Sequence, residues 1–271
     1  MKQTMFLCVI VLLLLSVKSY ADETDPQTQP LDETLDTWGI ETSLMYSSGD
    51  FGTSTDTRTL YWPTTIRRYF TKGDAGFTIP FIDQTATPGV AAIKGHPFRI
   101  NRSNSGQKRS DTGLGDLLLD GHYHFFDEST EAFNLSGFGQ LKFPTADEEK
   151  GLGTGEFDTT LGLESSKNLN ELWSTYIDLY YTFIGEPPGT DLDDQFTFDG
   201  GVGYNLTEKT MATLFYREQT ALVDDEDNAR DVILGLNHMI DDATKIYGKS
   251  SFGLTDGSPD WTLIGGIAYL F

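Results

Sequence analysis

One stretch of the chain, residues 172–184, reads LWSTYIDLYYTFI and alternates between apolar and polar side chains. Trp173 and Leu179 stand at odd positions, whereas Ser174 and Asp178 stand at even positions. Successive side chains of a β-strand point to opposite faces of the sheet. The stretch therefore predicts a β-strand that is apolar on one face and polar on the other.

The same alternation recurs along the chain on both sides of this stretch. In residues 131–143 and 194–205, Phe and Leu or Val alternate with Asn, Ser, Thr, Asp and Gly. Turn residues separate the segments, as expected between strands. The twelve predicted strands cover residues 38–47, 57–70, 75–84, 114–126, 131–143, 156–167, 172–184, 194–205, 209–218, 229–239, 244–254 and 260–271.

Such strands build either a soluble sandwich with its apolar face inward or a membrane barrel with its apolar face outward. The connections discriminate between the two, because longer ones alternate with ones of about four residues or fewer, as in outer-membrane barrels. We therefore predict an all-β fold, an antiparallel up-and-down transmembrane β-barrel with both ends in the periplasm. The connections cover residues 48–56, 71–74, 85–113, 127–130, 144–155, 168–171, 185–193, 206–208, 219–228, 240–243 and 255–259.

The amino-terminal part of the chain has a different character. Residues 1–21 combine Lys2, an apolar run and the small residues Ser19 and Ala21, which is the layout of a cleaved signal peptide. The single cysteine, Cys8, lies inside it, so we expect neither a disulfide nor thiol chemistry in the barrel. Residues 22–37 are rich in acids and predict a flexible leader, followed by the barrel over residues 38–271.

The net charge and the hydropathy of the chain limit the classes of protein to which it can belong. The formal net charge is −22, which argues against a nucleic-acid partner. No stretch after residue 21 is apolar for 18 residues, as a membrane-spanning helix would require. Yet the chain holds 28 Gly, 12 Tyr and 18 Phe, which suits strands that present every second side chain to lipid. We expect location in the bacterial outer membrane, in contact with its lipid and lipopolysaccharide.

The carboxyl end carries a second signal. Trp261, Leu263, Ile267, Tyr269 and Phe271 share one face of the last predicted strand. An amphipathic strand that ends on an aromatic residue resembles the assembly signal of outer-membrane proteins. Tyr269 and Phe271 are therefore predicted to be recognised by the barrel-assembly machinery.

Glycine-rich motifs suggest a family. Residues 113–117 read GLGDL, 141–145 read LKFPT and 151–155 read GLGTG, followed by Phe157 and Asp158. Together with the NLTEK turn that ends at Lys209, they resemble the family of the putative MetA pathway of phenol degradation. The resemblance implies a barrel treated as an outer-membrane transporter, with a link to aromatic compounds.

The polar faces of the predicted strands carry charge, which in a membrane barrel lies in the hydrated lumen. One interpretation is a constriction that selects solutes. The other is a solvated or plugged lumen whose charges only pair with one another. The candidate residues are Asp116, Asp120, His122, His124, Lys142, Asp158, Glu164, Asp178, Asp199 and Arg217.

The same polar residues offer little for metal binding or catalysis. His122 and His124 face the same way and lie near Asp116 and Asp120, but no third ligand stands at a characteristic spacing, so we predict no metal and no cofactor. The sequence has no Gly-x-Ser-x-Gly motif, and we expect no enzyme. A membrane-embedded hydrolase is kept as a third function.

The longest connection, residues 85–113, is basic, whereas the other long loops are acidic. Opposite charges could draw it across or into the mouth of the barrel. Alternatively it meets lipopolysaccharide phosphates while acidic loops such as residues 224–227 bind divalent cations, or it is disordered.

The leading functional prediction is a channel or transporter for small solutes, with hydrophobic or aromatic compounds as one class. About 8 strands enclose only side chains or one small ligand, and about 16 enclose an aqueous channel. Twelve strands predict a narrow path. The alternative is a closed barrel with a structural or surface-binding role.

Overall fold

The computed structural model describes residues 37–51, 55–86, 90–93, 95–99 and 108–271. The expected signal peptide and all but the last residue of the expected leader lie outside these residues. Within the described ranges, no helix has the length and apolarity needed to cross a membrane. The helical element of this part is the short 3-10 helix η2 (Glu148–Lys150).

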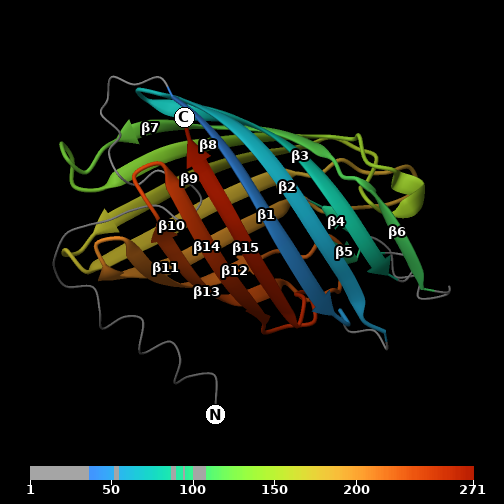
Figure 1. The fold of residues 1–271 in the computed structure, drawn as a ribbon. Coiled ribbons are helices and arrows are strands. Elements are labelled where there is room, and N and C mark those ends of the chain that lie inside the picture. The colour runs from blue at the N-terminus through green and yellow to red at the C-terminus, as the bar shows by residue number, and fades with distance from the viewer. Residues whose placement is uncertain (1–36, 52–54, 87–89, 94, 100–107) are drawn as a thin grey trace, which may run out of the picture.

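A closed antiparallel β-barrel forms the body of the molecule (Figure 1). Outside the β3–β6–β7 region, each strand of the wall pairs with its neighbours in sequence, and β1 pairs with β15 to close the wall. Its strands are β1 (Thr37–Gly49), β2 (Thr57–Phe70), β3 (Gly73–Ala86), β6 (Arg109–Leu114), β7 (Leu117–Phe126), β8 (Asn134–Phe143), β9 (Asp158–Asn168), β10 (Trp173–Phe183), β11 (Gln195–Thr207), β12 (Thr210–Gln219), β13 (Ala229–Met239), β14 (Thr244–Gly253) and β15 (Trp261–Leu270).

One position in the wall is divided between two of these strands. β6 pairs with the end of β3 over residues 81–86, and β7 pairs with its beginning over residues 73–78. The break falls at Gly115, whose N–H donates to the carbonyl of Pro80. In the described residues the barrel therefore has twelve strand positions, which confirms the predicted fold.

The predicted alternation fixes which face meets lipid. Ile177 and Leu179 of β10 are 56% and 40% exposed, whereas Ser174 and Thr182 of the same strand are buried. Exposed apolar side chains recur on the outer face of the other strands, as Trp62, Leu161 and Leu263 do. Since this belt surrounds a closed wall, the barrel is apolar outside and polar inside.

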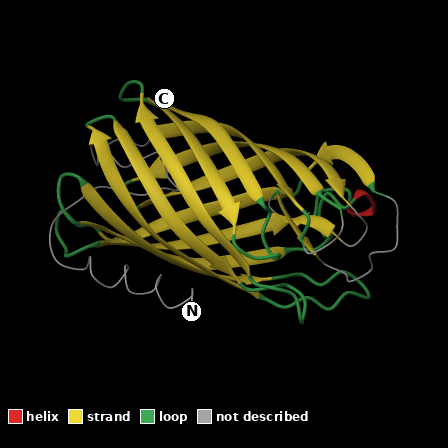
Figure 2. Ribbon diagram, turned by 90° about the horizontal axis from the view of Figure 1, so that it is seen from below, coloured by secondary structure: helices red, strands yellow, loops and turns green. Residues whose placement is uncertain are grey.

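Short turns and long loops lie at opposite ends (Figures 1 and 2). The short turns include residues 71–72, 208–209 and 240–243, and the long loops include 144–157 and 184–194. The first and last strands meet at the short-turn end, where Trp38 and Phe271 exchange backbone hydrogen bonds of 3.0 and 2.8 Å.

A small hairpin lies inside the mouth at the long-loop end. It consists of β4 (Val90–Ile93) and β5 (His96–Arg99), which pair antiparallel within the basic connection. Gly95 forms its turn with φ +80°, and a Cβ there would lie 2.3 Å from the ring of Tyr61 on β2. Only glycine fits both the positive φ and this close approach.

Two apolar clusters hold the hairpin in place. Ala92 packs in a cluster with Met45, Tyr61 and Ile82 on the inner wall and with Leu152 of the loop after β8. Ile93 packs in a second cluster with three loop residues, Ile184, Leu192 and Leu222. The N–H of Ala92 also donates to the carbonyl of Gly151 at 3.3 Å. The hairpin is therefore wedged between the wall and the long loops. This favours the expectation that the basic connection enters the mouth.

Candidate functional site

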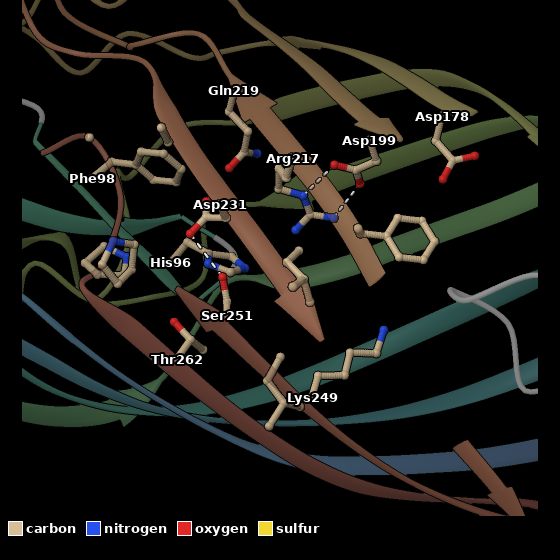
Figure 3. A pocket seen from close by; sticks show the side chains of 17 residues that line it. His96, Phe98, Asp178, Asp199, Arg217, Gln219, Asp231, Lys249, Ser251 and Thr262 are labelled. Carbon is tan, nitrogen blue, oxygen red and sulfur yellow. Dashed lines mark hydrogen bonds and ion pairs between the residues drawn. The ribbon is translucent and has the colours of Figure 1, made fainter. Parts of the chain in front are cut away.

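A cavity of about 120 Å³ lies in the lumen beside the hairpin (Figure 3). We call it the mouth cavity. Its wall comes from β10 to β15, the hairpin and the loop before β15. It is lined by His96, Pro97, Phe98, Asp178, Asp199, Phe215, Arg217, Gln219, Ala229, Asp231, Ile233, Lys249, Ser251, Gly257, Pro259, Thr262 and Ile264.

The charges of the mouth cavity are held in fixed positions. The Arg217 guanidinium donates from Nε and Nη2 to the two carboxylate oxygens of Asp199 at 2.7 and 2.5 Å (Figure 3). Asp231 accepts hydrogen bonds of 3.0 Å from the hydroxyls of Ser251 and Ser258. Such bidentate, charge-assisted contacts orient both partners. The cavity therefore presents a fixed pattern of charge to any solute.

Apolar side chains stand between these charges. Phe98 comes from the hairpin, and Phe215, Ile233 and Ile264 come from the facing wall. Small-molecule sites in proteins combine a mainly apolar lining with a few placed polar groups. The lining of the mouth cavity has this mixed character.

A second group of charges is buried between the wall and the loop after β8. Lys142 Nζ lies 3.2 Å from Asp116 and 3.1 Å from Asp158, and it donates to the Thr154 hydroxyl at 2.7 Å. The side chains of Lys142 and Asp158 have no exposed surface. We call these four residues the Lys142 cluster.

The Lys142 cluster also fixes backbone segments. Asp116 accepts from the N–H groups of Thr145 and Ala146 at 3.0 and 2.9 Å, and Asp158 accepts from that of Gly185 at 3.0 Å. The carboxylates thus tie two long loops to the wall. None of the four cluster residues is among those that line the mouth cavity.

A third group lies on the inner wall nearer the short-turn end. Arg67 of β2 pairs with Asp74 and, at 2.6 Å, with Asp120. The Nδ1 atom of His122 lies 3.0 Å from a carboxylate oxygen of Asp74, and its Nε2 atom lies 3.5 Å from a carboxylate oxygen of Glu164. We call these five residues the Arg67 cluster. Tyr180 donates to the other oxygen of Glu164 at 2.8 Å.

Acidic side chains gather at the long-loop end outside the strands. Partial burial, together with the neighbouring carboxylates of Asp50, Asp56 and Asp256, raises the pKa of Asp260. On the loop after β8, the hydrogen bond with Lys150 lowers the pKa of Asp147. Cation binding by these loops stays a prediction.

Comparison with known proteins now identifies the family. The family model described as Putative MetA-pathway of phenol degradation matches residues 22–271. The chain belongs to this family. The motifs that suggested it meet in the structure, because GLGDL supplies Asp116, LKFPT supplies Lys142 and GLGTG supplies Thr154. No protein with a curated description matches the chain.

Solved structures share the barrel. An outer membrane channel from Pseudomonas putida F1 has a TM-score of 0.65 at 13% identity, over 93% of this chain and 100% of that chain. The KdgM porin has a TM-score of 0.54 at 10% identity, over 86% and 99%. The NanC porin has a TM-score of 0.54 at 9% identity, over 85% and 98%. With its apolar belt, this fold places the family member in the bacterial outer membrane.

The candidate residues predicted from the sequence divide among these groups. Asp178, Asp199 and Arg217 line the mouth cavity. Asp116, Lys142 and Asp158 form the buried Lys142 cluster, and Asp120, His122 and Glu164 belong to the Arg67 cluster. His124 faces the lumen and contacts the Ser136 hydroxyl at 2.8 Å, apart from the clusters.

Sequence reasoning missed several residues of these sites. Arg67 is adjacent to Arg68, and the signal that could have found it is the apolar face formed by Trp62, Ile66 and Phe70, which leaves Arg67 on the lumen face. Asp74 lies in the predicted connection 71–74, but in the structure it belongs to β3, which begins at Gly73. Asp231 and Lys249 lie on predicted strands, and their lumen-facing positions were the signal that could have found them.

Proposed function

We propose that this protein is an outer-membrane channel that admits small solutes through the lumen. The observation that carries the proposal is the mouth cavity, which remains beside the hairpin at the long-loop end. The hairpin takes up part of a lumen that twelve strands already make narrow. The path therefore suits small solutes and excludes large ones.

The solute class follows from the lining of the mouth cavity. Phe98, Phe215 and Ile233 offer apolar contact, and Arg217 and Asp231 offer polar contact. Small aromatic or otherwise partly hydrophobic compounds meet both requirements. The family description refers to phenol degradation, which agrees with this class. Entry of such compounds into cells should be faster when the protein is made.

An acidic lumen should also favour cations over anions, because fixed charges in a narrow pore attract counter-ions. Carboxylates on the lumen face of the described strands outnumber the bases there. The acids are Glu41, Asp74, Asp111, Asp120, Asp158, Glu164, Asp178, Asp199 and Asp231, and the bases are Arg67, Arg109, Lys142, Arg217, Lys245 and Lys249.

Planar bilayers with a salt gradient test the proposal. The purified barrel should give small discrete current steps with a cation-selective reversal potential. Asp178→Asn, in the mouth cavity, should move that potential toward zero, whereas Asp241→Asn, in a short turn outside the lumen, should not. Equal reversal potentials for wild type and Asp178→Asn would show that this carboxylate does not contribute to cation selectivity.

A closed barrel with a structural or surface-binding role is the second candidate. The apolar packing of Ile93 and Ala92 against the loops and wall favours it, since this packing resists opening. A folded barrel that passes no current would support it. The hydrolase remains a third candidate, and a lipid-hydrolysis assay on the purified barrel tests it.

A further inference from the structure

We propose that His122 and Glu164 bind a divalent transition-metal ion on the lumen wall. Their side chains are only 6% and 7% exposed. His122 Nε2 and one oxygen of Glu164, Oε2, have no hydrogen-bond partner among the described residues. These two atoms face one another at 3.5 Å.

The orientation of His122 leaves Nε2 available as a ligand. Its Nδ1 lies 3.0 and 3.1 Å from the two oxygens of Asp74. A proton on Nδ1 that is donated to Asp74 leaves a lone pair on Nε2, directed toward a carboxylate oxygen that also carries lone pairs. A histidine held by a carboxylate in this way is the usual arrangement of a metal-bound imidazole.

The separation of the two atoms matches two ligands of one ion. A charge-assisted N–H···O bond would bring them to about 2.7–2.9 Å, well below the 3.5 Å observed. Two donors at about 2.1 Å from a tetrahedral Zn²⁺ lie about 3.4 Å apart. The separation is therefore long for a charge-assisted hydrogen bond and matches two ligands of one ion that lies beside the line joining them.

Arg67 determines on which side of His122 the ion binds. Oxygens of Asp74 and Asp120 and a nitrogen of His122 lie within 4.8 Å of one another, but the Arg67 guanidinium already contacts both aspartates. That side of the imidazole is occupied by a cation. The side that faces Glu164 is the one on which an ion fits.

The charge of the Arg67 cluster agrees with a divalent ion. With a neutral imidazole, the cluster holds the three carboxylates of Asp74, Asp120 and Glu164 and one guanidinium, that of Arg67, which contacts the two aspartates. Buried charge that is not neutralised is unfavourable. A divalent cation balances the cluster, whereas one proton on His122 would leave it negative.

The donors select the kind of metal. One imidazole nitrogen and one carboxylate oxygen suit Zn²⁺ and similar first-row ions. Ca²⁺ and Mg²⁺ prefer sites built from oxygen alone. Water on the lumen side would complete the coordination shell.

Calorimetric titration of the refolded full barrel in detergent with ZnCl₂ tests this proposal. We expect one ion per barrel. His122→Gln should abolish this binding, and Asp74→Asn, which frees the imidazole, should weaken it about 10- to 100-fold. His124→Gln, on the same face two residues away, is the matched control and should bind as wild type does.

A spectroscopic readout locates the ion. Co²⁺ should give visible absorption bands that His122→Gln and Glu164→Gln lose and His124→Gln keeps. CaCl₂ in excess should not displace the Co²⁺ signal. Variants are compared only as heat-modifiable, folded barrels. Equal Zn²⁺ binding by wild type, His122→Gln and Glu164→Gln, or no binding by wild type, would overturn the proposal.

Discussion

The Lys142 ammonium lies 3.1 Å from the Asp158 carboxylate, and neither side chain has any exposed surface. The Lys142 ammonium also contacts the Asp116 carboxylate and donates a hydrogen bond to the Thr154 hydroxyl. Removing one partner of such a buried pair leaves uncompensated charge, which is costly. The cluster therefore joins the long loops to the wall through residues of the family motifs, and its charges depend on one another.

Lys142→Met should lower the free energy of unfolding by about 3–5 kcal/mol, because two buried carboxylates lose their counter-ion. Urea unfolding in detergent measures the change. Lys167→Met is the control, since Lys167 is half exposed and lies 4.0 Å from Glu128. A Lys142→Met barrel that unfolds at the wild-type urea concentration would show that the cluster contributes little.

The inside and outside of the wall can be tested with two adjacent residues of β10. Leu179 is exposed to lipid, and Asp178 lines the mouth cavity. Leu179→Arg should cost about 2–4 kcal/mol if it lies near the bilayer midplane. Asp178→Asn should cost far less. Equal costs in the same unfolding assay would contradict the assignment of the two faces.

The terminal aromatic residue should matter for assembly in cells. Phe271 exchanges two backbone hydrogen bonds with Trp38, and its exposed ring stacks on Tyr269 at 6.1 Å between ring centroids. Phe271→Asp should reduce the amount of heat-modifiable barrel in the outer membrane. Normal levels of folded Phe271→Asp would argue against its role as an assembly signal.

Much of the wall was predictable because it depends on local alternation. Period-2 segments gave the strand order, the apolar outer face and the lumen positions of Asp199 and Arg217. The break between β6 and β7 was not predictable. There Asp116 turns away from the strand ladder to accept backbone N–H groups of the loop after β8. That contact joins residues about 30 positions apart.

The hairpin was beyond sequence reasoning for the same reason. β4 and β5 have four residues each, too few to show a clear period. Their positions depend on contacts with Tyr61, Leu152 and Leu192, which lie far away in sequence. The pairing of the lumen charges was also not predictable from the sequence. Alternation placed them on the lumen face, but only the fold decides which of them pair.

Two adjacent serines of β14 allow the mouth cavity to be probed directly. Ser251 lines it, whereas Ser250 lies on the opposite face of the same strand. The single cysteine, Cys8, lies in the expected signal peptide, so introduced thiols should be the only ones. A charged, water-soluble thiol reagent should reduce the current of Ser251→Cys and leave that of Ser250→Cys unchanged. The reverse result would place the conducting path elsewhere.

The most direct measurement for the channel account is the single-channel current of the folded barrel with and without the β4–β5 hairpin. Residues 90–99 would be replaced by a short Gly-Ser link, and folding would be checked by heat modifiability. The account predicts small discrete steps for the wild-type barrel and larger steps for the shortened variant, because the hairpin narrows the mouth. If neither the folded wild-type barrel nor the folded shortened variant passes current, the channel proposal is wrong and a closed barrel is favoured.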